Sequence, residues 1–299
     1  MSIWKRILNV FNWLKVNIFY IGKQTVYWTS SIIAIFQIIG FLCDFNDIFP
    51  ETMSFIDRLW ISMLVVVAIW LILFIIKAVL VYKKERVTVI DAENGNCVYV
   101  EYGDLLKESQ EEKVVVVAVN RCFDTIVDDD LIAKGTIHGK FIKKICSNGY
   151  SEKKLNNEIQ KDLREKRKIL PEKTLSKTEK WKGNVERYPV GSIAELKKGK
   201  TTYFLVAMCI FNNELHSETT DVEYITMLQT LIEYCNKRSQ KRPVYMPILG
   251  THGRSNKKTE QELLQYMVDT MRFHKHLINT DIHIVVFQDR KSHVSIYDL

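Results

Sequence analysis

Residues 113–125 read KVVVVAVNRCFDT, and this stretch decides the fold class. The residues from Val114 to Val119 are all apolar, so we expect a strand at 113–120 that is covered on both faces. Two other stretches have the same character, YFLVAMCIF at 203–211 and IHIVVF at 282–287. We therefore expect these three strands at the middle of a sheet that is flanked by helices.

Around these strands, shorter β-branched stretches and longer amphipathic ones alternate, which is typical of an α/β domain. Further strands are expected at 87–91, 97–102 and 244–249. Helices are expected at 130–146, 152–167, 220–238 and 259–277. Residues 151–184 are highly charged, and they are predicted to form a surface insertion with one helix and a mobile loop.

The first 81 residues differ from the rest because their apolar residues form long runs. Neither 26–43 (VYWTSSIIAIFQIIGFLC) nor 59–76 (LWISMLVVVAIWLILFII) contains a charged residue. Runs of this length are near the lower limit for a helix that crosses a bilayer. Residues 26–81 are therefore predicted to form a two-helix transmembrane hairpin. The alternative, two buried helices of a soluble protein, would require an unusually large core.

Charged residues near these runs predict an orientation. Basic residues precede the first run and follow the second, whereas the connecting loop carries Asp44, Asp47, Glu51 and Asp57. Under the positive-inside rule both chain ends, and with them residues 82–299, face the cytoplasm. Residues 1–25 place Trp4, Ile7 and Phe11 at helical spacing among basic residues, which predicts an amphipathic segment in the membrane interface.

Cysteines and net charge exclude several classes of site. The six cysteines form no CxxC pair and have no histidine at ligand spacing, so neither a metal centre nor a disulfide framework is indicated. The net charge of +7 comes mainly from residues beside the apolar runs and from 153–182. This distribution favours anionic lipid over nucleic acid as a partner.

A candidate ligand site follows the strand at 244–249, in the sequence MPILGTHGRSNKKTEQELLQYM at 246–267. Glycines in a strand-to-helix turn let backbone N–H groups approach an oxyanion, and the helix N-terminus favours negative charge. The candidate residues are Gly250, Thr251, His252, Gly253, Arg254 and Ser255. A turn without a ligand is the alternative. Asp104 and Asn120, each at a strand end, are equally compatible with capping of backbone groups.

Taken in order, Gly103-Asp104-Leu105, Val119-Asn120 and the glycine turn resemble the motifs of a macro domain. The resemblance implies a macro-like mixed sheet flanked by helices. It also implies that Asp104 meets an adenine, that Asn120 faces the distal ribose, and that the glycine turn holds the diphosphate of ADP-ribose. Leu105, Thr136 and His138 would line the same pocket. For His138, a histidine satisfied within its helix is the alternative.

One departure from the macro-domain pattern affects the expected activity. After Asn120 the family usually continues with a second asparagine and a glycine-rich loop, whereas here Arg121, Cys122, Phe123 and Asp124 follow. Arg121 is accordingly a further candidate ligand contact. The departure implies a protein that binds its ligand intact, with no catalytic residues and no cofactor. The alternative is an ADP-ribosyl hydrolase in which Asn120, Asp124 or His138 activates water.

A two-span anchor before such a domain resembles the membrane-anchored ThsA effectors of Thoeris anti-phage defence. This resemblance implies a multi-pass protein of the bacterial inner membrane. Its signal would be an ADP-ribose derivative, histidine-ADP-ribose for this type, made by a TIR-domain partner. Binding would trigger homo-oligomer assembly and membrane disruption. A structural membrane adaptor is a third interpretation.

Overall fold

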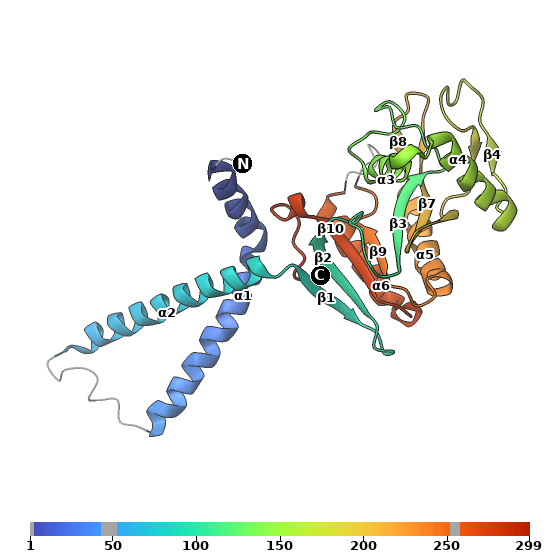
Figure 1. Cartoon of the computed structure of the whole chain (residues 1–299). Coiled ribbons are helices and arrows are strands. Elements are labelled where there is room, and N and C mark those ends of the chain that lie inside the picture. The colour runs from blue at the N-terminus through green and yellow to red at the C-terminus, as the bar shows by residue number, and fades with distance from the viewer. Residues whose placement is uncertain (1–2, 43–52, 252–257) are drawn as a thin grey trace. The chain divides into compact units, whose positions relative to one another are not determined.

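The computed structural model describes residues 3–42, 53–251 and 258–299. The chain divides into two compact units, which we describe separately. Unit 1 comprises Met1–Glu85 and Lys291–Asp298, and unit 2 comprises Arg86–Arg290 with Leu299. Figure 1 labels the helices and strands of both units.

Unit 2 is built on a mixed sheet with strand order β1-β2-β10-β9-β3-β7-β6. The five consecutive strands from β2 to β7 in that order run parallel, and β1 and β6 close the two edges as antiparallel strands. A short strand, β8, pairs antiparallel with the end of β7. The strands are β1 (Arg86–Asp91), β2 (Cys97–Gly103), β3 (Lys113–Asn120), β6 (Ile193–Lys198), β7 (Thr201–Phe211), β8 (Ser217–Glu218), β9 (Val244–Pro247) and β10 (Ile282–Phe287).

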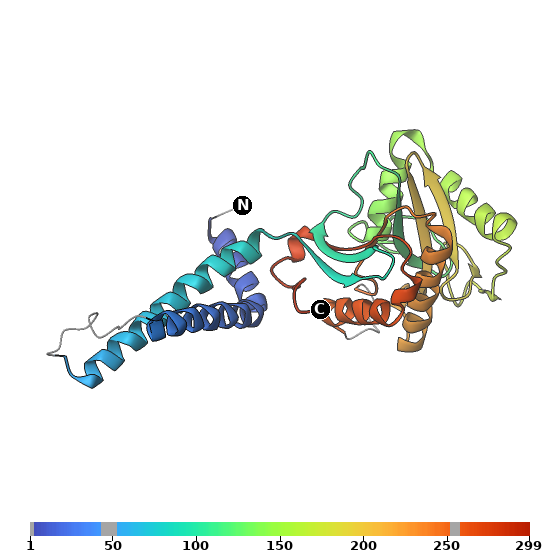
Figure 2. The ribbon, with the colours of Figure 1, turned by 90° about the horizontal axis from the view of Figure 1, so that it is seen from below.

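Helices cover both faces of this sheet, as the uninterrupted apolar strands predict. Figure 2 shows α3 and α4 on one side of the sheet and α5 and α6 on the other. The helices are α3 (Ile137–Cys146), α4 (Glu152–Lys161), α5 (Asp221–Arg238) and α6 (Glu260–Phe273). The macro-like mixed sheet flanked by helices is thereby confirmed.

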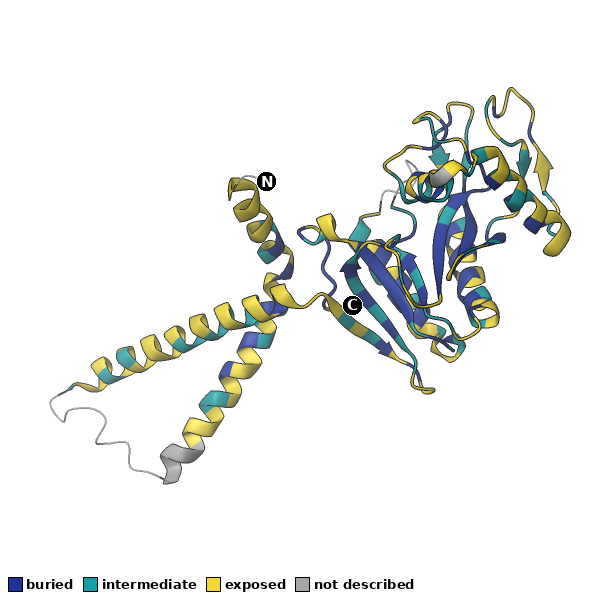
Figure 3. Cartoon of the chain, viewed as in Figure 1, coloured by how far each residue is buried: buried dark blue, intermediate teal, exposed yellow. Residues whose placement is uncertain are grey.

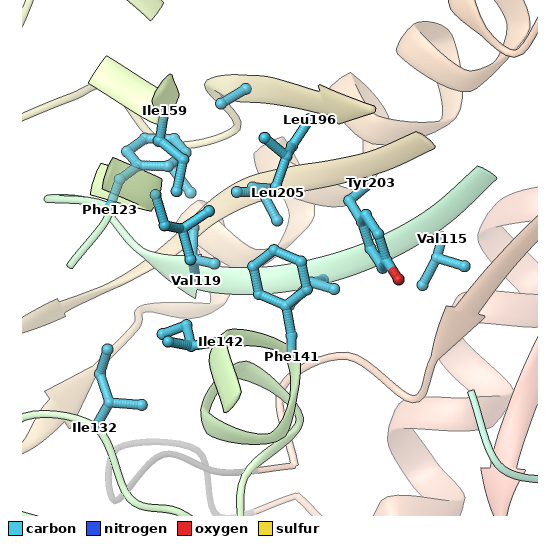
Figure 4. Close-up of a cluster of buried hydrophobic side chains, with 14 of the residues drawn as sticks. Val115, Val119, Phe123, Ile132, Phe141, Ile142, Ile159, Leu196, Tyr203 and Leu205 are labelled. Atoms are coloured by element: carbon cyan, nitrogen blue, oxygen red, sulfur yellow. The ribbon is translucent and has the colours of Figure 1, made fainter. Parts of the chain in front are cut away.

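Alternate residues of β3 face opposite layers of the core. Val115, Val117 and Val119 pack in one cluster with Phe141 and Ile142 of α3 (Figure 4). Their neighbours Val114 and Val116 are also fully buried. Burial on both faces explains why this strand reads as an unbroken apolar run.

Two predictions about unit 2 need correction. The helix expected at 130–146 begins only at Ile137, because Asp128 and Asp129 accept backbone N–H groups of Asp130, Leu131 and Lys134 and hold a turn there. The charged segment 151–184 is not a surface appendage. Its helix α4 and the following π-helical turn bury Leu155, Ile159 and Leu163 in the main core.

Unit 2 also contains strands that were not expected. The edge strand β6 is short and half of its residues (IAELKK) are charged, so it does not stand out from the surrounding charged sequence. A separate two-stranded sheet joins β4 (Lys173–Thr174) to β5 (Glu186–Arg187). Periodicity cannot predict β4 or β5, since a two-residue strand carries no pattern.

Unit 1 contains two long helices, α1 (Ile3–Leu42) and α2 (Phe55–Lys83). The α1 helix runs without interruption through the boundary expected near residue 25. Trp13 contacts Tyr82 edge to face at 5.0 Å, and the Lys77 ammonium lies 4.3 Å from the centre of the Trp28 ring. These contacts pack the two helices against each other.

Most residues of α2 are exposed, as the yellow ribbon of Figure 3 shows. Within the described residues, α2 is the one helix that is long and apolar enough to cross a membrane, with a hydropathy of 3.1 over its most apolar window. Only 6% of that window is buried. The part of the first expected span at 38–43 lies outside the residues whose side chains are described.

Residues Lys291–Asp298, which we call the return segment, belong to unit 1 although they follow the last strand of unit 2. Ser295 Oγ donates to Asn17 Oδ1 at 2.7 Å, and both residues are buried. The Tyr297 hydroxyl donates to the carbonyl of Val81 at 2.7 Å, and its ring stacks on Tyr20. The return segment therefore contacts both helices of unit 1.

Candidate functional site

A cavity of about 830 Å³ opens at the edge of the sheet where the parallel strands end. Its described lining comes from the ends of β3 and β7, from residues 129–138, from the turn after β9 and from Trp181. The carboxyl ends of parallel strands are where open α/β sheets bind ligands. The volume lies within the range of small-molecule sites. The candidate site is therefore at this cavity.

Asn120, the last residue of β3, lines the cavity and is only 2% exposed. Its Oδ1 accepts the backbone N–H groups of Cys122 at 3.0 Å and Asp124 at 3.4 Å, which fixes the amide orientation. Its Nδ2 has no acceptor within hydrogen-bond distance among the described residues, although a weaker interaction with the Asp124 carboxylate helps to lower the pKa of that group. A buried donor without a partner is costly in a folded protein. This N–H group is therefore available to a ligand acceptor.

The turn that follows Asn120 is tight. The N–H of Phe123 donates to the Asn120 carbonyl at 2.9 Å, and Phe123 has a φ of 51°. A large side chain rarely adopts this left-handed conformation. Phe123 tolerates it because its ring is buried and meets Tyr188 edge to face at 5.6 Å. We call residues Asn120–Asp124 the β3 turn.

The glycine turn after β9 contributes Gly250 and Thr251 to the lining. Gly250 has a φ of 84°, a conformation that glycine adopts without strain. The predicted residues His252, Gly253, Arg254 and Ser255 lie outside the described residues. At the start of α6, Thr259 and Glu262 form a capping box in which each accepts the other's backbone N–H.

Thr136 and His138 line the cavity from the start of α3, as expected. Thr136 caps this helix, because its Oγ1 accepts the N–H of Gly139 at 3.0 Å. Burial lowers the pKa of His138 from 6.5 to about 4, although a hydrogen bond with the backbone of Asp124 favours the protonated form. His138 is therefore neutral at pH 7, and the ring nitrogen that does not bond to Asp124 is suited to accept a hydrogen bond from a ligand.

Three predicted ligand contacts are absent from the described lining of the cavity, and each has another partner. Asp104 is exposed, and its Oδ1 accepts the N–H of Leu106 at 3.0 Å. Leu105 is buried in the hydrophobic core. The Arg121 guanidinium pairs with Glu172 at 2.5 Å and Glu223 at 2.7 Å. Asp104 therefore closes a turn, Leu105 packs in the core, and Arg121 forms ion pairs within the protein.

Asp124 is buried in an ion pair rather than facing the cavity. Its Oδ2 lies 2.7 Å from the ammonium of Lys180, and both side chains are 1% exposed. Burial raises the pKa of Asp124, although Lys180 acts in the opposite direction. Burial likewise raises the pKa of the neighbouring Cys122 thiol to about 11, so this thiol is unreactive at neutral pH.

The described residues contain no group of three or more His, Cys, Asp or Glu residues that could hold a metal ion. Sequence reasoning missed Trp181 and the residues between Met208 and Ser217. The second set follows from β7 itself, because a strand that ends beside β3 must contribute to the same edge.

Comparisons with known proteins give a family match, a relative and a solved structure. Residues 98–287 match the family described as Thoeris protein ThsA, Macro domain. Thoeris protein ThsA of Bacillus amyloliquefaciens (strain Y2) is 27% identical over 191 residues, which are 64% of this chain and 60% of that protein. The chain thus spans less than two thirds of the relative's length. A mutant macrodomain of Oceanobacillus iheyensis aligns with a TM-score of 0.45 and 14% identity over 72% of this chain and 94% of the other.

Proposed function

This chain belongs to the Thoeris ThsA macro-domain family, and on that premise we propose that it is an anti-phage defence effector whose unit 2 binds an ADP-ribose-type nucleotide. Asn120 carries the proposal. Its buried Nδ2 has no acceptor within hydrogen-bond distance among the described residues, and Asn120 lines a cavity at the carboxyl ends of parallel strands. A ribose hydroxyl or phosphate oxygen is an acceptor that would satisfy it.

We further propose that the signal is histidine-ADP-ribose made by a TIR-domain partner. A ligand acts on an equilibrium only through its different affinities for two states of the protein. In this proposal the liganded state of unit 2 favours assembly of several copies, and the α1–α2 pair then disrupts the bilayer. The exposed apolar length of α2 supports its placement in lipid.

Binding without hydrolysis is favoured by the position of Asp124. An ADP-ribosyl hydrolase needs a base that reaches a water molecule at the scissile bond. Asp124 is enclosed with Lys180 and is absent from the described lining of the cavity. His138 lines the cavity as a neutral ring, which is suited to positioning a ligand. We therefore propose a receptor rather than an enzyme.

Asn120→Asp tests the proposed function most directly. The substitution keeps an oxygen that accepts the Cys122 and Asp124 N–H groups, but it replaces the free donor by a second oxygen. We expect affinity for ADP-ribose or histidine-ADP-ribose to fall about tenfold or more, since a lost hydrogen bond to a buried group costs about 1–3 kcal/mol. Calorimetry on the purified full chain in detergent measures the change.

Asn279→Asp is the matched control, because Asn279 is a half-buried asparagine outside the described lining of the cavity. Its affinity for ADP-ribose should equal that of the wild type. Melting temperatures of both variants separate lost binding from lost folding. If wild-type protein binds none of ADP-ribose, NAD and histidine-ADP-ribose, the proposed function is wrong.

A further inference from the structure

Trp181 lies in the charged segment 151–184, lines the cavity, and is 56% exposed. The other tryptophans of the chain all precede residue 86, so Trp181 is the sole tryptophan of unit 2. A large aromatic ring gains little from hydrophobic burial when more than half of it remains exposed. Its position at the mouth of a cavity therefore calls for an explanation other than core packing.

The residues on both sides of Trp181 are fixed by ion pairs. Lys180 is buried with Asp124, and its ammonium also donates to the carbonyl of Asn184 at 2.7 Å. Lys182 pairs with Asp128 and, at 3.2 Å, with Asp130. The Lys182 ammonium lies 5.2 Å from the centre of the indole ring, within cation–π range. The backbone that carries Trp181 is thus held in place by ion pairs of the residue before it and the residue after it.

The same backbone is fastened to the β3 turn. The N–H of Asn184 donates to Asp124 Oδ1 at 2.6 Å, and the Asn184 side chain donates to the carbonyls of Cys122 and Phe123. Gly183 has a φ of 84°, and a Cβ at this position would lie 2.2 Å from Asp124 Oδ1. Only glycine permits this close approach.

Trp181 and the free donor of Asn120 are therefore attached to one rigid turn and line one cavity. A binding site gains affinity when its contacts are held in place before the ligand arrives. A partly exposed indole on such a support offers a planar surface to another planar ring. Stacking of a base on an aromatic side chain is favourable for every base, because each has a π face.

We propose that Trp181 is a stacking platform for a planar heteroaromatic ring of the ligand. The proposal rests on the nucleotide-binding function proposed above and adds the contact that recognises the ring. Two rings are possible occupants: the adenine, or a ring attached to the second ribose. Both involve the same stacking contact, and different probes distinguish them.

Intrinsic fluorescence of the full chain in detergent tests the proposal. We expect saturating ADP-ribose, NAD or histidine-ADP-ribose to change the emission of the wild type more than that of Trp181→Phe, whose five remaining tryptophans lie in unit 1. The difference between the two proteins reports Trp181 alone. By calorimetry, Trp181→Leu should bind the same probe about tenfold or more weakly, and Trp181→Phe should retain most of the affinity.

Leu170→Ala is the matched control, since Leu170 is 79% exposed in the same segment and is absent from the described lining. It should bind with wild-type affinity.

The choice of probe identifies the ring that stacks on Trp181. An emission change with AMP assigns the ring to the adenine, and a change that requires NAD or histidine-ADP-ribose assigns it to the second ribose; either result supports stacking. If Trp181→Leu binds as tightly as the wild type, stacking is overturned while nucleotide binding stands. If no probe binds the wild type, both proposals fall.

Discussion

His138 lies in the first turn of α3 and faces the cavity, and burial lowers its pKa to about 4. The unfolded chain takes up a proton on this histidine near pH 6.5, whereas the folded chain does so only near pH 4. Between these values the unfolded state binds more protons, so stability falls as pH falls and changes no further below about 4. We expect His138→Gln to lose less melting temperature than the wild type between pH 7.5 and 5.

His276→Gln is the control for this pH experiment, because it removes an exposed histidine outside the described lining of the cavity. Its loss of melting temperature on acidification should match that of the wild type. Equal losses in all three proteins would show that the folded state does not disfavour protonation of His138.

Single residues also show how far sequence reasoning reaches. Asn120 and Asp104 gave the same signal, a polar residue at a strand end, yet Asn120 lines the cavity and Asp104 closes an exposed turn. The difference depends on the strand order, which places β3 beside β7 and β9 while β2 lies beyond β10. Arg121 was a plausible anion contact until Glu172 and Glu223, distant in sequence, proved to be its partners.

At the scale of elements, long apolar strands were predictable, whereas the charged edge strand β6 and the two-residue strands β4, β5 and β8 were not. The bounds expected for β3 and β10 were confirmed because each strand is buried on both faces and ends at a polar residue or a turn. Trp181 was missed for a different reason. Its segment is rich in charge, and charge usually indicates solvent, but Lys180 and Asp124 neutralise each other in the interior.

The return segment yields a prediction about unit 1. The Tyr297 hydroxyl donates to the carbonyls of Val81 at 2.7 Å and Lys84 at 3.0 Å. The hydroxyl has one proton, which the two carbonyls share. Tyr297→Phe removes this shared bond, worth about 1 kcal/mol, and keeps the ring that stacks on Tyr20. We expect amide hydrogen exchange in peptides covering 291–298 to accelerate about fivefold or more.

Tyr27→Phe is the control for the exchange experiment, because Tyr27 is a tyrosine of α1 that is 61% exposed. Exchange in residues 291–298 should remain at the wild-type rate in this variant. If Tyr297→Phe also leaves that rate unchanged, the shared hydroxyl bond does not hold the return segment in place.

At the scale of the whole molecule, membrane attachment through α2 is the property to test. The helix has 29 residues and would extend about 44 Å, enough to cross a hydrocarbon core of about 30 Å. Val67→Arg with Leu71→Arg places two charges near its middle, each costing about 3 kcal/mol on insertion scales. We expect the double variant to leave the carbonate-resistant membrane fraction, as followed by immunoblotting.

The matched control puts the same two charges on unit 2. Val222 and Phe273 are 73% and 81% exposed, so their replacement by arginine adds charge without disturbing a core. This protein should stay in the membrane fraction. Retention of the α2 double variant there as well would show that α2 is not what anchors the chain.

The order of synthesis gives the return segment a further consequence. Roughly 200 residues separate the end of α2 from Lys291, and at about 5–20 residues per second the ribosome needs roughly 10–40 s to make them. Throughout that interval the nascent α1–α2 pair lacks Ser295 and Tyr297, its latest contacts. A product truncated before residue 291 therefore lacks the contacts that the return segment makes with α1 and α2.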